Sequence, residues 1–316
     1  MSNIFDALQR AKTERTADSV DALALETELL RIAEQDPPQN GYSSNTASEL
    51  ASAAEPASSD FPYDEFERLP VSIMADSKLV CINDKESLAA EKFRFLAVKL
   101  RQLQQTRQLK KVLISSTIPG EGKSMVAANL ACTLARRRQR RTLLIDGDLR
   151  RPTLARQFGL GAVPGIGEVL QGSSDLSHSI FGLENLGFWI LPAGITLDNP
   201  LELLQSAKLG AIMQQLAAWF DWIVIDSPPI LPLADTTIWA RLADGVLIVT
   251  RKGVTEKKQL KKGLEVFESS KLLGALLNSS INVAHSDYYH YYRPNAAGRK
   301  NHSPSSPGTS KNTDQE

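Results

Sequence analysis

A lysine and a serine follow a glycine-containing turn in the stretch KKVLISSTIPGEGKS, residues 110–124. Gly120 and Gly122 would let the backbone fold closely around an anion, so that amide N–H groups point at phosphate oxygens. Lys123 would then place a positive charge on the β and γ phosphates of a nucleotide, and Ser124 would offer a hydroxyl to Mg²⁺. These residue types at this spacing predict a phosphate-binding loop.

The residues around this turn supply the context that the motif requires. Residues 112–115, VLIS, have the pattern of a buried parallel strand, and residues 125–135, MVAANLACTLA, have that of the helix that follows it. One position departs from the usual pattern GxxxxGK[ST], because Thr117 stands where that pattern has glycine. The order strand, turn, helix still favours a nucleotide site over a chance Gly-Lys-Ser turn.

Carboxylates follow two further apolar runs. Asp146 and Asp148 lie in TLLIDGDLRRP, residues 142–152, and Asp226 ends the apolar part of WIVIDSPP, residues 222–229. Ligands bind at the carboxyl ends of parallel strands, so these acids are expected to face the nucleotide. Asp226 would hold the Mg²⁺ shell, Asp146 would accept a proton from an attacking hydroxyl, and Asp148 would share metal or proton-accepting work.

Four of the chain's six tyrosines gather near its C-terminus, in SDYYHYYR. They are Tyr288, Tyr289, Tyr291 and Tyr292. Adjacent residues point in different directions, so the group does not suit a single core face. An aromatic patch for a partner is one interpretation and a set of phosphate acceptors is the other; a nucleotide site in the same chain favours the second. The chain from Asn278 to Tyr292 could extend roughly 45 Å, enough to return to the site.

Strand and helix patterns alternate along residues 112–278, which predicts an α/β fold with a mostly parallel, doubly wound sheet of the P-loop NTPase type, carrying Walker A, A′ and B motifs. Further strands are expected at 187–191, 246–250 and 272–278, and a possible edge strand at 78–82. Helices are expected over 84–105 and, as one broken helix or two consecutive ones, over 200–220.

Composition divides the chain into four segments. Residues 1–35 carry two short apolar stripes at helical spacing and are expected to form a helical segment, either loosely attached or used to dock a partner helix. Residues 36–60 are rich in Pro, Ser and Ala, and residues 36–75 are expected to be a flexible linker. Residues 76–281 would form the P-loop domain, and 282–316 a disordered tail that begins with the tyrosines.

Charge and cysteine usage exclude several classes of protein. Lys plus Arg and Asp plus Glu both total 36, so no overall field favours nucleic acid. Cys81 and Cys132 are the only cysteines, which is too few for a disulfide framework. The N-terminus is not a signal peptide, and no run approaches the ~18 apolar residues of a membrane span. A cytoplasmic protein is expected.

The motifs taken together resemble the bacterial tyrosine autokinases of polysaccharide synthesis and export. The matching pieces, between about Ser77 and Tyr292, are SSTIPGEGKS, LLIDGDLRRP, NPLELLQS, WIVIDSPP and the tyrosine cluster. The resemblance implies ATP and Mg²⁺ as cofactors. Nucleotide contacts are implied for the loop, the first helical turn and the last strand, that is for Gly120, Glu121, Gly122, Lys123, Ser124, Met125 and Asn278.

The same resemblance assigns roles to the other candidate residues. It implies catalytic roles for Lys123, Asp146 and Asp148, and metal binding by Ser124 and Asp226. The four tail tyrosines would be autophosphorylated, largely by neighbours in a ring-shaped oligomer. Contact of Asn278 with adenine is one interpretation, and an asparagine satisfied by the backbone is the alternative.

Partners are implied in the same way. Family members are stimulated by a membrane-embedded activator, fused or separate, and this chain resembles the separate kinase, recruited peripherally to the inner face of the membrane. A protein-tyrosine phosphatase would reverse the modification. The ring contact of the family uses the helix motif ExxRxxR; EKFRFLAV supplies Glu91 and Arg94 but has Ala97 at the third position, which leaves the oligomer size open.

Two other functions compete with the kinase. A nucleotide-switched positioning ATPase, of the partition and division-site type, would hydrolyse ATP without phosphorylating protein. Those ATPases carry a second lysine early in the phosphate loop, where this chain has Ile118. A scaffold that binds ATP only to expose its tail is the third possibility.

Overall fold

The computed structural model describes residues 61–62, 65–73, 77–136, 140–195, 199–231 and 234–278. The chain divides into two units, and all of these residues lie in the second, which begins at Ser58. The helices predicted for residues 1–35 and the tail predicted for residues 282–316 lie outside the described residues, as do all six tyrosines.

The described residues form one eight-stranded sheet with the order β1-β4-β5-β3-β6-β2-β7-β8. Its strands are β1 (Arg68–Leu69), β2 (Lys111–Ser116), β3 (Thr142–Asp146), β4 (Phe181–Leu183), β5 (Phe188–Leu191), β6 (Trp222–Asp226), β7 (Gly245–Arg251) and β8 (Leu272–Asn278). Neighbouring strands are parallel except β4 and β5, which are antiparallel. The predicted mostly parallel α/β sheet is therefore confirmed.

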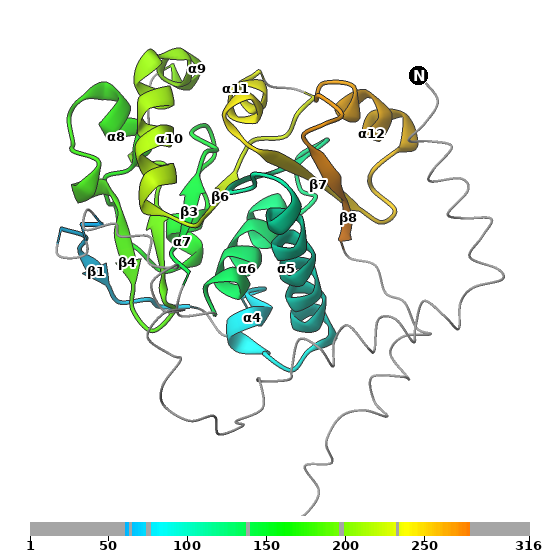
Figure 1. Cartoon of the computed structure of the whole chain (residues 1–316), viewed down its shortest axis with the longest axis horizontal. Coiled ribbons are helices and arrows are strands. Elements are labelled where there is room, and N and C mark those ends of the chain that lie inside the picture. The colour runs from blue at the N-terminus through cyan, green and yellow to red at the C-terminus, as the bar shows by residue number, and fades with distance from the viewer. Residues whose placement is uncertain are drawn as a thin grey trace, which may run out of the picture. The chain divides into compact units, whose positions relative to one another are not determined.

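Helices cover both faces of this sheet (Figure 1). They are α4 (Val80–Asn83), α5 (Leu88–Thr106), α6 (Lys123–Ala135), α7 (Leu154–Gln157), α8 (Ile166–Gln171), the 3₁₀ helix Ser177–Ser179, α9 (Pro200–Gln205), α10 (Ala207–Trp219), α11 (Asp235–Leu242) and α12 (Lys257–Leu264). Helices α4, α5 and α6 pack against one another over one face, and α8 to α12 pack over the other. None of the helices in this part of the chain is long and apolar enough to cross a lipid bilayer.

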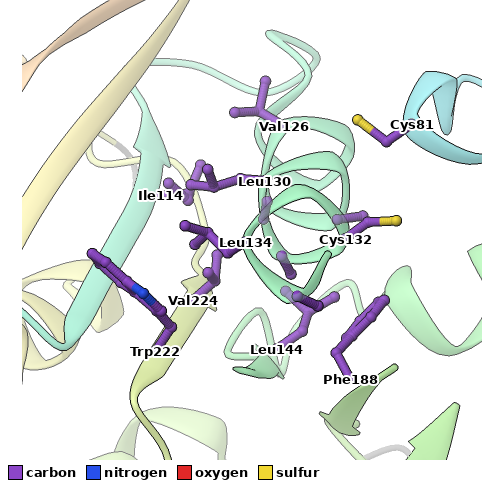
Figure 2. Close-up of a cluster of buried hydrophobic side chains, with 14 of the residues drawn as sticks. Cys81, Ile114, Val126, Leu130, Cys132, Leu134, Leu144, Phe188, Trp222 and Val224 are labelled. Carbon is purple, nitrogen blue, oxygen red and sulfur yellow. The ribbon is translucent and has the colours of Figure 1, made fainter. Parts of the chain in front are cut away.

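The central strands are apolar on both sides because both faces of the sheet are buried. In β2, Val112 and Ile114 belong to the core under α6, whereas Leu113 belongs to the core under α10 and α11. Figure 2 shows Ile114 and Val224, from two neighbouring strands, pointing at Leu130 and Leu134 of α6. This packing fixes the helix that follows the phosphate loop against the centre of the sheet.

The prediction of an edge strand at residues 78–82 is wrong, because the short helix α4 begins at Val80 within this run. Its backbone bonds to a side chain of α6 and not to a strand: the Cys81 amide donates to Asn129 Oδ1 at 3.1 Å, and Asn129 Nδ2 donates to the Lys78 carbonyl at 3.0 Å. Short apolar runs have the same periodicity in a strand and in a buried helix, which explains the error.

The folded unit begins earlier than the predicted boundary at residue 76. Strand β1 lies inside the predicted linker and pairs with β4. Phe61 and Phe66 are buried, and the Phe61 ring centroid lies 5.3 Å from those of Trp189 and Phe220. Phe61, Phe66 and β1 therefore belong to the folded core, although all three lie inside the predicted linker.

We expect Phe61→Ala to destabilise the protein by about 3 kcal/mol, because it removes a buried aromatic ring and leaves a cavity in the core. Urea unfolding followed by tryptophan fluorescence measures this. Glu65→Ala, at an exposed neighbouring position, should leave the midpoint unchanged. Equal midpoints for both variants would show that the core begins later in the chain.

Candidate nucleotide and phosphoryl-transfer site

The turn between β2 and α6 has the geometry of an anion-binding loop. Gly120 and Gly122 both adopt left-handed backbone conformations, with φ of 82° and 94°. Residues other than glycine are strained in this conformation, so the sequence has glycine where the turn requires it. Helix α6 begins at Lys123, and its free N–H groups lie directly after the turn.

Thr117 fits the loop although the usual pattern has glycine at this position. Its φ is not among the positive values of the described residues, so no glycine conformation is needed there. The side chain is fully buried: its hydroxyl donates to the Glu121 carboxylate at 3.1 Å. Its methyl group lies against α12, where a Cβ on Gly263 would approach Thr117 Cγ2 to 2.7 Å. The departure from the pattern is therefore compensated by packing.

Lys123 contacts one of the predicted acids. Its Nζ lies 3.3 Å from Asp148 Oδ2, and both side chains are mostly buried. The other oxygen, Asp148 Oδ1, accepts from the Arg151 amide at 3.1 Å. The loop that follows β3 thus holds Asp148 beside the lysine ammonium, where it can orient the charge that meets the phosphates.

Asp146 and Asp226 lie opposite each other in the register of β3 and β6, at the carboxyl ends of these strands. Each has one buried oxygen, Oδ1, without a hydrogen-bond partner among the described residues. Asp146 Oδ2 is occupied, accepting from the Thr153 and Leu154 amides at 3.0 Å each. These two oxygens are therefore left for a ligand, a cation or a proton to satisfy.

Burial raises the pKa of both carboxyls. The pKa of Asp146 rises to about 6, because loss of water outweighs the two amide hydrogen bonds, and the charge of Asp148 raises it further. The pKa of Asp226 rises to about 8, again through burial, although the Lys123 ammonium and the Ser124 hydroxyl lower it. These acids favour a cation or a proton beside them at neutral pH.

The residues present fit a magnesium ion that arrives with a nucleotide. The Ser124 hydroxyl, which hydrogen-bonds to the Asp226 carboxylate, and the unpartnered Oδ1 of Asp226 are both oxygen ligands of the kind that Mg²⁺ prefers. The described residues hold no group of three or more His, Cys, Asp or Glu that could form a complete cage. Mg²⁺ usually takes its remaining ligands from phosphates and water.

Asn278 lies beside the phosphate loop at the end of β8. Its Nδ2 donates to the Glu121 carbonyl at 2.9 Å, and a Cβ on Gly122 would clash with Nδ2. The side-chain amide nitrogen of Asn278 is therefore bonded to the backbone, as the alternative interpretation expected. Contact with adenine stays a prediction, as does nucleotide contact by Met125 in the first turn of α6.

The structure also identifies residues that the sequence analysis missed. Asp235, at the start of α11, is fully buried and pairs with Arg150 at 2.7 and 3.1 Å. Trp239 of the same helix donates its indole N–H to the Gly147 carbonyl at 3.0 Å. Both contacts hold the loop around Asp148 against α11. The first arginine of LRRP was the available signal for Arg150, but its partner is distant in sequence.

Two residues of the helix motif predicted for the ring contact form interactions within the chain itself. Glu91 and Arg94 form an ion pair on α5, and Arg94 also donates to the Lys85 carbonyl at 2.8 Å. Ala97 is fully buried in the core of the sheet. An oligomer therefore stays a prediction, with Glu91 and Arg94 as its surface residues.

A parallel sheet with a lysine-tipped loop and carboxylates at adjacent strand ends defines a P-loop nucleotide-binding protein. A family model of the ParA group, described as NUBPL iron-transfer P-loop NTPase, matches residues 108–297. The tyrosine-protein kinase YwqD of Bacillus subtilis is 36% identical over 67% of this chain and 90% of its own length. The chain belongs to the bacterial tyrosine-protein kinases.

Solved structures agree with this assignment. The chimerical protein CapA2B2 has a TM-score of 0.62 and 30% identity, over 67% of this chain and 94% of its own. The VpsO kinase domain has a TM-score of 0.54 and 34% identity, over 62% of this chain and 100% of its own. The predicted family and fold are therefore confirmed.

The raised pKa of Asp226 predicts a pH effect on stability in the absence of metal. An unfolded aspartate ionises near pH ~4, so between pH ~4 and 8 the native state holds a proton that the unfolded state has lost. Wild-type stability should fall over this window. We expect Asp226→Asn to gain roughly 2 kcal/mol or more over the wild type at pH 8 in EDTA, and less than half of that at pH 5.

Urea unfolding at the two pH values measures this difference. Asp175→Asn, which changes a carboxylate that is 87% exposed, serves as the matched control and should show no such gain. A wild type more stable than Asp226→Asn at pH 8 would contradict the buried, protonated carboxyl.

Proposed function

We propose that this chain is an ATP-dependent protein-tyrosine kinase that transfers the γ-phosphate of ATP to its own C-terminal tyrosines, Tyr288, Tyr289, Tyr291 and Tyr292. The observation that carries the proposal is the convergence of Lys123, Asp148 and the unpartnered carboxylate oxygens of Asp146 and Asp226 at one end of the sheet. Family membership supports the same activity. By analogy with the kinases it resembles, the protein would act in exopolysaccharide or capsule synthesis or export.

The site residues divide the work of phosphoryl transfer. The phosphate loop, through Gly120 to Ser124, would hold the β and γ phosphates, while the Lys123 ammonium neutralises the charge that spreads over the transferred group. Bound Mg²⁺ would neutralise the remaining phosphate charge, held by Ser124 directly and by Asp226 through water. Asp148 would keep the lysine in place.

Asp146 is the best candidate for the proton acceptor. Its Oδ1 has no partner among the described residues, and its raised pKa of about 6 lies close to working pH. The tyrosine oxygen would form the new P–O bond as the bond from the γ-phosphorus to the β,γ-bridging oxygen breaks. ADP would leave with that oxygen, and the phenolic proton would pass to Asp146 and then to water.

The iron-transfer role in the name of the matching family model does not suit this chain. Its only cysteines, Cys81 and Cys132, are both buried. Burial raises the pKa of the Cys132 thiol to about 12 and also raises that of Cys81, which disfavours the thiolate that binds metal. The positioning ATPase is the remaining alternative, since it uses the same fold, but Ile118 stands where its second lysine is required.

The partners belong to the proposal. A homo-oligomer would let one chain phosphorylate the tail of a neighbour, and a membrane-embedded activator of a polysaccharide export system would recruit the kinase to the inner face of the membrane. A protein-tyrosine phosphatase would return the tail to its starting state. No nucleic acid is expected, because the formal net charge is zero.

Labelled ATP and Mg²⁺ test the activity. We expect phosphate on the tail tyrosines, and Lys123→Met should reduce the label below about 1% of wild type, because the charge on the phosphates is lost. Replacing the four tail tyrosines by phenylalanine should remove the label. Tyr42→Phe combined with Tyr63→Phe, the matched control, should retain it.

The other outcomes separate the alternatives. Release of free phosphate without labelled protein would support the positioning ATPase. Neither label nor free phosphate would support the scaffold.

A further inference from the structure

The phosphate loop is tied to the segment that follows β7. Arg251 Nη1 donates to the Gly120 carbonyl at 3.3 Å, and the Thr255 hydroxyl donates to the Glu121 carboxylate. Asn278, which pairs with Arg251 in the sheet register, adds its contact with the Glu121 carbonyl. Three contacts from the β7–β8 side of the sheet thus meet two adjacent residues of the loop.

Glu121 is the centre of these contacts, and it does not present its side chain to solvent. The side chain is fully buried. Its oxygens accept from the Ile118 amide at 3.0 Å and from the Thr117 hydroxyl at 3.1 and 3.2 Å, in addition to Thr255. One carboxylate therefore joins the start of the loop, the end of the loop and the turn before α12.

Both oxygens of the Glu121 side chain act as hydrogen-bond acceptors. Thr117, Ile118 and Thr255 all donate, and a carboxylate is acceptor-only when ionised. A glutamine of the same size would replace one acceptor oxygen by an NH₂ donor, so a group that donates there now would lose its acceptor. A buried donor without a partner is costly, so the loop should shift.

We propose that Glu121 and Thr255 are positioning residues that set the geometry of the phosphate loop from the turn between β7 and α12. The inference rests on the proposed function of this site in ATP binding and transfer. Packing supports it, because Gly263 of α12 lies against the Thr117 methyl group from the same side. Movement of the β7–α12 turn would therefore alter the loop that holds ATP.

Thr255→Val and Thr255→Ser form the matched pair that tests the proposal. Valine keeps the shape and removes the hydroxyl, whereas serine keeps the hydroxyl. We expect Thr255→Val to weaken MgADP binding about tenfold in calorimetry and to raise the KM for ATP in tail phosphorylation by a similar factor. Thr255→Ser should stay within about twofold of wild type, and Glu121→Gln should weaken binding at least as much as Thr255→Val.

The readouts distinguish positioning from a purely structural role. A structural role would lower the melting temperature of Thr255→Val without changing its MgADP affinity or KM, and that result overturns the proposal. Equal MgADP affinities for the valine and serine variants overturn it as well. If Thr255→Val does not fold, Glu121→Gln with wild-type MgADP affinity would overturn it in the same way.

Binding and labelling report on different claims. A tenfold loss of MgADP affinity in Thr255→Val, together with no tyrosine label in the wild type, would support the positioning and reject the kinase. Label in the wild type with unchanged affinity in Thr255→Val would support the kinase and reject the positioning.

Discussion

The structure depends on the burial of charged groups where three parallel strands end. Strand β6 lies between β3 and β2, and the register of β3 and β6 places Asp146 opposite Asp226. The loop after β2 places Lys123 beside Asp148. Burial raises the pKa of the two opposed carboxyls, so a positive charge or a proton beside them is favoured. Mg²⁺ bound with a nucleotide would supply that charge, and this would link the fold to its ligand.

A second constraint acts on the loop itself. A phosphate loop must hold its amides in place before the phosphates arrive, because preorganised donors stabilise a developing charge without moving. Here Glu121 takes this role, joining Thr117 and Ile118 to Thr255. The loop is consequently held by the β7–β8 side of the sheet, while its lysine is held by the loop after β3. The two halves of the site would meet at the phosphates of a bound nucleotide.

The central strands and the acids at their ends could be predicted from sequence, because a strand buried on both faces is a continuous apolar run and a carboxylate at its end has no packing role. Helix α4 could not, because its identity depends on hydrogen bonds to Asn129, 48 residues after Cys81. The role of Glu121 was missed for the same reason, since Thr255 lies 134 residues away. Strand β1 is two residues long, too short for any periodicity.

A crystal structure with a non-hydrolysable ATP analogue and Mg²⁺ tests the central claim most directly. The account predicts the γ-phosphate in contact with Lys123 Nζ, the metal held by the Ser124 hydroxyl, and Asp226 beside the metal shell with Asp146 Oδ1 open to an incoming hydroxyl. A nucleotide bound elsewhere, or a metal on the far side of the loop from Asp226, would contradict it.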